Sequence, residues 1–215
     1  MADLLAPIEY GVYIAADADN MTRLLAETFS RRDPPAVAVG LTAPEFEAFV
    51  RLLCPNAAAE GLTIVARLAS TGELVGVMLT EDCASPPLQG LDKLSPKFDP
   101  IFDILGQLDT EYWGGKAARP GEALHLFLLG VSDRVAGRGV AHQLVTECLQ
   151  HGANRGYRLA VTEATNKVSQ HIFRKQGFMA RVQRSYQTHL FNGKPVFASI
   201  AGHGGPILMD KSLTR

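Results

Sequence analysis

The stretch that decides the fold runs from Leu128 to Ala141 and reads L-L-G-V-S-D-R-V-A-G-R-G-V-A. Its apolar first part is typical of a strand, and a glycine-rich turn then leads into an amphipathic helix that begins near Val140. Such a turn points several backbone N–H groups, together with the positive end of the helix dipole, at one spot. Its glycines let a ligand approach the backbone closely, and Arg134 and Arg138 add positive charge. We therefore expect a site for a phosphate or pyrophosphate group.

The spacing of the glycines narrows the choice of phosphate ligand. A P-loop would need glycine, four residues and then Gly-Lys-Ser/Thr, a run that the sequence lacks. The dinucleotide fingerprint G-x-G-x-x-G fails as well, because His142 stands at its third glycine position. The pattern that fits is Arg-x-x-Gly-x-Gly with alanine two residues later, formed by Arg134, Gly137, Gly139 and Ala141. A tight turn without any ligand is the alternative reading.

This pattern resembles the coenzyme A pyrophosphate loop of the GCN5-related N-acetyltransferase (GNAT) superfamily. The segment from Asn166 to Phe178 is similar to a second core motif of that superfamily, a short helix that ends in Gly-Phe. The resemblance implies an α/β fold with a central, mixed, mostly antiparallel twisted sheet flanked by helices, and acetyl-CoA as co-substrate. It places the coenzyme contacts at Leu129, Gly130, Val131, Arg134, Gly137, Arg138, Gly139, Val140, Ala141, Ser169 and Phe173.

A narrower resemblance is to the insect-type arylalkylamine (dopamine-type) N-acetyltransferases. It rests on the Asp33-Pro34 junction, on residues 129–134, on the helix around Ser169 and on the tail 193–211. In that family an acidic residue directly before the proline acts as general base through water, and two hydroxyls four residues apart complete the proton path. The matching catalytic residues are Asp33, Thr165 and Ser169, where aspartate and threonine replace the usual glutamate and serine.

Each of these assignments has a plainer alternative. Asp33 before a proline is also typical of a solvated turn, and Thr165 or Asn166 also suits a helix N-cap. Ser169 on a short helix is compatible with a solvent-facing position. Many superfamily members carry a tyrosine as general acid where this chain has Phe173, which favours Ser169 as the group that protonates or orients the sulfur of coenzyme A.

Other polar residues admit two readings as well. His125 lies within the apolar run 123–131, and it is either a second candidate for the general base or a hydrogen-bonded core residue. Glu147 and His151 stand four residues apart on a helix, where an exposed pair is commoner than a metal site, and we expect no metal. The three cysteines form no C-x-x-C pair, and Cys148 falls on the apolar stripe of a helix, which favours a core position.

Composition excludes several classes of protein. The chain has 215 residues, of which 47% are hydrophobic and 20% charged, and we expect one compact domain over residues 1–215. A net charge of −1 supplies no global positive field for nucleic acid or an anionic membrane. Residues 1–5 show no basic stretch followed by an apolar run, and no 18 apolar residues follow one another. We expect a cytoplasmic protein, a monomer or homodimer.

Hydrophobic periodicity and turn residues predict alternating strands and helices. We expect strands at residues 9–15, 62–68, 74–80, 123–131, 158–162, 178–186 and 206–209. We expect helices that run from Asp17 or Asp19 to residue 30, from residue 42 to at least residue 53, and over residues 99–112, 140–149 and 167–175. Residues 34–56 and 82–112 exceed a minimal acetyltransferase core, and we expect acceptor specificity to be built there. Phe46, Phe49 and Tyr112 are candidate walls of an aromatic pocket, although core positions explain all three equally well.

The resulting hypothesis is acetyl-CoA-dependent N-acetylation of a primary amine on a small molecule, by direct transfer in a ternary complex. An arylalkylamine is one candidate acceptor. The alternatives are a polyamine, an antibiotic amine or a protein amino group as acceptor, and a non-catalytic sensor that binds coenzyme A.

Overall fold

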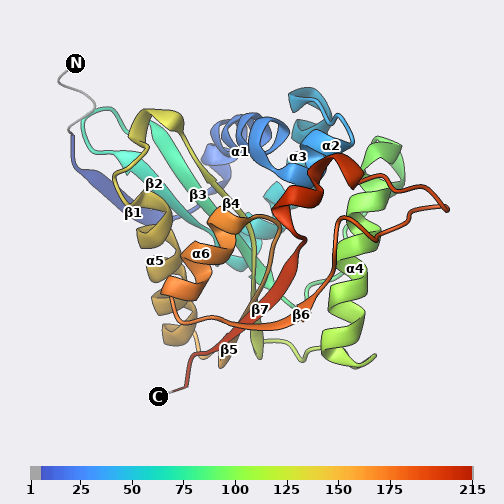
Figure 1. Ribbon diagram of the computed structural model, residues 1–215. Coiled ribbons are helices and arrows are strands. Elements are labelled where there is room, and N and C mark those ends of the chain that lie inside the picture. Colours follow the sequence, from blue (N-terminus) through green and yellow to red (C-terminus); the bar gives the residue numbers. More distant parts are fainter. Residues whose placement is uncertain (1–5, 215) are drawn as a thin grey trace.

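The computed structural model describes residues 6–214, so the expectation for residues 1–5 lies outside it. Its centre is a seven-stranded sheet with the order β1-β2-β3-β4-β5-β7-β6 (Figure 1). All neighbouring strands are antiparallel except β4 and β5, which confirms the expected mixed, mostly antiparallel sheet. The strands are β1 (Ile8–Val12), β2 (Ile64–Leu68), β3 (Leu74–Asp82), β4 (Ala123–Val131), β5 (Leu159–Ala164), β6 (Met179–Gln183) and β7 (Ile207–Ser212).

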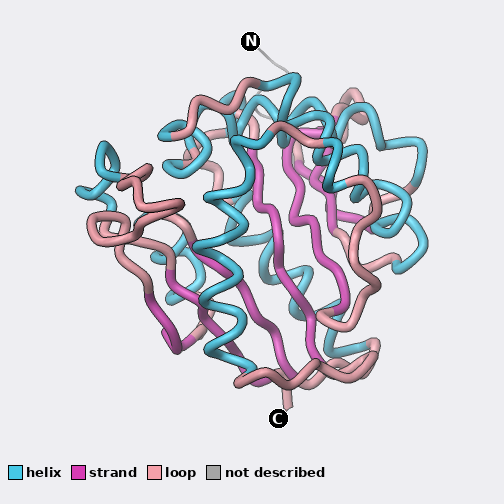
Figure 2. Tube along the Cα trace, turned by 90° about the vertical axis from the view of Figure 1, so that its right-hand side faces the viewer, coloured by secondary structure: helices cyan, strands magenta, loops and turns pink. Residues whose placement is uncertain are grey.

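Helices cover both faces of this sheet (Figures 1 and 2). They are α1 (Ala18–Arg32), α2 (Pro34–Ala38), α3 (Ala43–Glu60), α4 (Asp99–Trp113), α5 (Val140–Asn154) and α6 (Lys167–Lys175). The apolar stripe of α5 packs on one face, in a core that includes Leu144, Cys148 and Leu126. Helices α1 and α3 pack on the other face around Leu25, Phe49 and Leu128. Among the described residues, no helix is both long and apolar enough to cross a membrane.

The start of α2 departs from the sequence expectation. We expected the first helix to end near Ser30, but α1 continues to Arg32 and α2 begins directly after Asp33. Proline fits the first turn of a helix because the N–H it lacks would have no helical partner there. The Asp33 side chain caps α2 by accepting from the backbone N–H of Ala36. The two helices therefore meet at a bend whose corner residue is Asp33.

The parallel strands β4 and β5 separate after a short paired region. They pair only from Ala123 to His125 on β4, although β4 continues to Val131 and β5 to Ala164. Phe127 is the extra residue of a β-bulge, because Leu126 and Leu128 pair with consecutive residues of β3. Bulges bend a strand and redirect its side chains. The result is a wedge-shaped gap in the middle of the sheet.

Several element boundaries differ from the prediction. The first strand ends at Val12 rather than at residue 15, and β6 ends at Gln183 rather than at residue 186. Conversely, β5 and β7 extend two and three residues beyond their expected ends, because they pair with each other along their whole lengths. Strand ends follow these cross-strand partners, which local composition does not reveal.

Candidate active site

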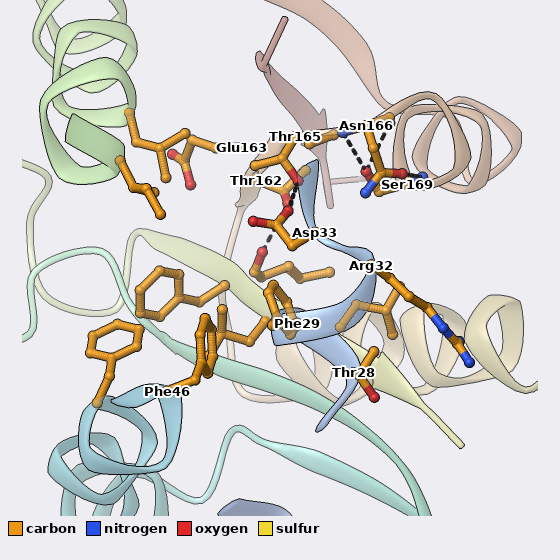
Figure 3. A pocket seen from close by; sticks show the side chains of 18 of the residues that line it. Thr28, Phe29, Arg32, Asp33, Phe46, Thr162, Glu163, Thr165, Asn166 and Ser169 are labelled. Carbon is orange, nitrogen blue, oxygen red and sulfur yellow. Dashed lines mark hydrogen bonds between the residues drawn. The ribbon is translucent and has the colours of Figure 1, made fainter. Parts of the chain in front are cut away.

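A cavity of about 150 Å³ occupies the gap between the separated strands. Its polar side is formed by Asp33 at the α1–α2 bend, by Thr165 just after β5 and by Ser169 on α6 (Figure 3). Its apolar side includes aromatic rings from three elements. Phe46 and Phe49 come from α3, Phe98 and Phe102 from the start of α4 and the residue before it, and Phe127 from β4. The cavity thus brings one carboxyl group and two hydroxyl groups against an aromatic wall.

Asp33 is buried at the polar end of this cavity, with 8% of its surface exposed. Thr165 Oγ1 donates to its Oδ1 at 2.5 Å, and the N–H of Ala36 donates to its Oδ2 at 3.3 Å. Burial raises the pKa of Asp33 to about 6, although both hydrogen bonds act in the opposite direction. The reading of Asp33 as a solvated turn residue is therefore wrong. A carboxyl group with this pKa is suited to accept a proton near neutral pH.

The two hydroxyl residues have different local roles. Asn166, not Thr165, is the N-cap of α6, and it forms a capping box with Ser169. The Ser169 hydroxyl donates to the backbone carbonyl of Asn166 at 3.0 Å while lining the cavity. Tyr186, which the sequence did not single out, is completely buried and donates to the backbone carbonyl of Thr165 at 2.8 Å. Tyr186 therefore supports the segment that holds Asp33.

The glycine-rich turn before α5 leaves several backbone N–H groups without a backbone acceptor. Gly137 and Gly139 have φ angles of 77° and 74°, a conformation that glycine adopts without strain. Within residues 6–214, the backbone N–H groups of Gly137, Gly139, Val140 and Ala141 donate no hydrogen bond to another backbone group. Such a set of free N–H groups at a helix start fits a pyrophosphate.

Comparison with known proteins shows which protein family has this fold. Residues 19–178 match the family model "Acetyltransferase (GNAT) family". The chain belongs to the GNAT family. As a member of that family it is an N-acetyltransferase, an enzyme class that uses acetyl-CoA as acetyl donor.

Solved structures resemble this acetyltransferase over nearly its whole length. The C-terminal condensation domain of Ebony, solved with β-alanyl-dopamine, has a TM-score of 0.88 at 13% identity, covering 97% of this chain and 100% of that one. Arylalkylamine N-acetyltransferase 2 from Aedes aegypti has a TM-score of 0.80 at 21% identity, covering 96% and 99%. The polyamine N-acetyltransferase of Drosophila melanogaster has a TM-score of 0.74 at 16% identity, covering 96% and 100%. At these identities the likeness establishes a shared fold.

The other residues expected to contact coenzyme A have structural duties in this acetyltransferase. A Cβ atom on Gly130 would lie 2.7 Å from the end of the Leu25 side chain on α1, so a larger residue here would require that side chain to move. Arg134 pairs with Glu73 at 2.5 Å, and Arg138 donates to the backbone carbonyl of Ala6. These contacts engage the guanidinium groups of both arginines.

Leu129 and Phe173 line the cavity, whereas the structure places Val131 at the end of β4. Phe173 is also a core residue, because its ring packs against Phe178 at 5.1 Å. Its phenyl ring has no proton to donate. Ser169 is therefore the hydroxyl donor that α6 contributes to the cavity lining.

His125 lies between two carboxylates. Its Nε2 is 2.6 Å from Glu163 Oε2, and its Nδ1 is 3.0 Å from Glu81 Oε1. Burial lowers the pKa of His125, but the charges and hydrogen bonds of Glu163 and Glu81 raise it well above its usual value. An imidazolium that donates from both nitrogens has no lone pair with which to take a proton from an amine. The geometry therefore favours Asp33 over His125 as the base.

Two of the three aromatic residues that were candidate pocket walls do line the cavity. Phe46 and Phe49 line the cavity, as expected. Tyr112 does not, because its hydroxyl donates to Asp210 at 2.7 Å and its ring packs against Trp113. Tyr112 instead attaches α4 to strand β7.

The remaining polar expectations concern metals and cysteines. Glu147 accepts from Gln143 and His151 contacts the carbonyl of Gly61, so these two residues form no pair with each other. Among the described residues, no group of three or more His, Cys, Asp or Glu side chains is arranged to hold a metal ion.

Cys148 is buried in the core and lies 3.1 Å from Thr80 Oγ1, and burial raises its pKa to about 12. The core reading of Cys148 is confirmed.

Proposed function

We propose that the chain transfers the acetyl group of acetyl-CoA to a primary amine of a small molecule, directly and within a ternary complex. The observation that carries the proposal is the buried Asp33 carboxyl, whose pKa lies near 6, in the cavity between the separated strands β4 and β5. The anion turn lies at the far end of β4, and its free N–H groups fit the pyrophosphate of the donor.

The proposed chemistry requires a neutral amine and a proton for the departing sulfur. The Asp33 carboxylate removes a proton from the ammonium form of the acceptor, directly or through one water molecule. Thr165 holds the carboxylate in place, and the buried Tyr186 holds Thr165. Acetyl-CoA supplies the thioester, whose C–S bond breaks as the C–N bond forms. The Ser169 hydroxyl orients or protonates the thiolate.

An arylalkylamine is one acceptor class that the cavity beside Asp33 suits. Seven phenylalanine side chains line the cavity, and an aromatic acceptor packs well against such a wall because offset and edge-on ring contacts are favourable. The similar fold of the Aedes aegypti arylalkylamine enzyme supports the same class. The similar fold of the Drosophila melanogaster polyamine enzyme supports polyamines as the other candidate class.

The decisive assay adds acetyl-CoA and a panel of primary amines to the purified protein and follows thiol release. We expect release with at least one arylalkylamine or polyamine. Asp33→Asn should reduce kcat/KM by about 10²–10⁴-fold, the usual contribution of a general base, while coenzyme A still binds. Thiol release from none of the arylalkylamines, polyamines and amino acids would sink the proposal. Coenzyme A binding without turnover in the unaltered protein would instead indicate a sensor.

A further inference from the structure

A second, larger cavity opens beside the one that holds Asp33. Its volume is about 860 Å³, and it lies between β3, β4, β5, α4 and the segment 83–91. The two cavities share four lining residues, Phe49, Phe102, Phe127 and Glu163. Figure 3 shows Glu163 between Asp33 and the green helix α4. An acceptor with its amine at Asp33 can therefore extend past the aromatic rings into this space.

The floor of the second cavity is a chain of three charged groups from three strands. Glu81 of β3 and Glu163 of β5 hold the imidazolium of His125 between them. Their side chains are only 20%, 11% and 19% exposed, respectively. Both imidazolium N–H groups are used by the carboxylates, so these three residues offer only acceptor oxygens to an occupant.

The charges facing this floor from the surrounding elements leave the cavity negative. Asp109 approaches from α4, and Glu163 raises the pKa of that carboxyl in addition to burial. Asp82 of β3 is engaged by the backbone N–H of Gly121 and the hydroxyl of Tyr157. Besides His125, the cation that lines the cavity is Lys116, which is exposed to solvent. Carboxylates thus outnumber cations around the space.

We propose that this cavity selects acceptors that carry a second cationic group, an ammonium or a guanidinium, remote from the amine that reacts. The inference rests on the proposed acetyl transfer and names the substrate class for it. The oxygens of Glu81 and Glu163 that His125 does not use accept hydrogen bonds from the remote cation, and Phe102 and Phe127 line its route. A carboxylate at the same place meets like charge and no free donor on Glu81, His125 or Glu163.

A metal ion does not explain this cluster as well. A metal would need an imidazole lone pair, and both nitrogens of His125 already contact a carboxylate oxygen. An organic cation needs no such lone pair, because it donates to the carboxylates and leaves the imidazolium undisturbed.

The test compares three acceptors that differ only in their remote end: pentylamine, 1,5-diaminopentane and 5-aminopentanoate, with their butyl and hexyl homologues. We expect kcat/KM for the best diamine to exceed that of the matched monoamine by about tenfold or more, and the amino acid to be the poorest of each set. A guanidinium analogue of the best diamine should share its advantage.

Substitutions of the cavity carboxylates test whether the cavity causes the preference for diamines. Glu163→Gln and, independently, Glu81→Gln should reduce the ratio of diamine to monoamine kcat/KM about tenfold. Glu9→Gln removes the same charge from an exposed site on the edge strand β1 and should leave the ratio unchanged. Circular dichroism checks that each variant is folded. If Glu163→Gln does not fold, the Glu81→Gln variant alone tests the inference.

The possible failures are distinguishable. Equal turnover of diamine and monoamine would overturn the cavity inference and leave acetyl transfer intact. A diamine preference that survives both substitutions would place the selecting group elsewhere and would also overturn it. Absence of thiol release with every amine would overturn the proposed function itself, and the inference with it.

Discussion

Asp33 has the most strongly altered chemistry among the residues proposed to act in catalysis. Its pKa rises from 3.8 to about 6 because the carboxyl group is buried. The folded protein therefore binds this proton more tightly than the unfolded chain does. The associated stability is fully present below pH 3.8 and is lost as pH rises through about 6. At one pKa unit per 1.36 kcal/mol, the ionised carboxylate costs about 3 kcal/mol of folding free energy.

The first prediction concerns the pH dependence of turnover. The value of kcat/KM should rise as pH passes through about 6, because only the ionised Asp33 accepts a proton. Thr165→Val removes a hydrogen bond that lowers the pKa, so the rise should move to higher pH. Steady-state rates between pH 5 and pH 8 measure both effects. An unmoved profile in the variant would show that Thr165 does not tune the base.

The second prediction concerns stability at the same residue. Asp33→Asn should increase the free energy of unfolding at pH 8, by up to about 3 kcal/mol, because asparagine needs no charge in the buried site. The gain should largely disappear at pH 4, where Asp33 is protonated in the folded protein. Urea denaturation at both pH values measures it. Asp92→Asn is the matched control, since Asp92 is exposed and its substitution should change stability by less than about 0.5 kcal/mol.

Helices α4 and α5 each contain a glycine, and the surroundings of each helix decide what that glycine does. Gly106 lies on the exposed side of α4, and a Cβ atom there would meet nothing within 4 Å. Gly152 lies in the last turn of α5, where a Cβ atom would collide with the Leu124 side chain on β4. Gly106 lies within the helix predicted at 99–112, whereas the helix predicted at 140–149 stops short of Gly152, which the structure places inside α5. Only Gly152 is required for a helix to approach the sheet.

The third prediction follows from this matched pair. Gly106→Ala should stabilise the protein by about 0.5–1 kcal/mol, because alanine loses less backbone entropy in a helix. Gly152→Ala should destabilise it by about 1–3 kcal/mol through overpacking against Leu124. Thermal unfolding of the two variants measures opposite shifts. A shift in the same direction for both would contradict the packing argument.

At the scale of the whole molecule, the sheet connects distant parts of the chain. Strand β7, the last in the sequence, lies between β5 and β6 and pairs with both. Its residues Leu208 and Met209 are completely buried, on opposite faces of the sheet. Strand β5, which leads directly to Thr165, therefore depends on β7 for its outer hydrogen-bonded partner.

The fourth prediction tests this dependence. A chain that ends at Gly205 lacks β7 and should lose cooperative unfolding, because burying two or three large apolar side chains contributes several kcal/mol to a total of about 5–15. A chain that ends at Leu213 keeps β7 with its hydrogen bond to Arg158 and should unfold like the full chain. Calorimetry distinguishes the two. A cooperative transition in the shorter chain would refute the proposed role of β7.

Several features could be predicted from the sequence because they depend on neighbours in the chain. The anion turn follows from the glycine spacing at Gly137 and Gly139, and α3 follows from the capping box between Thr42 and Glu45. The helix that begins at Pro34 escaped prediction, although Asp-Pro is a suitable helix start. The same junction also suits the end of the preceding helix, because the residue before a proline avoids the α region, and local sequence does not separate the two.

The sequence by itself determined the turn, the amphipathic helices and the residue types available for chemistry, because these depend on contacts within a few positions. Only the tertiary structure decided their chemical states. Asp33 meets Thr165 across 132 positions, and the pKa of Asp33 depends on the burial that follows. His125 became an ion-paired group because β3 and β5 bring Glu81 and Glu163 to either side of it. Burial and charge are properties of assembled surroundings, and no local pattern contains them.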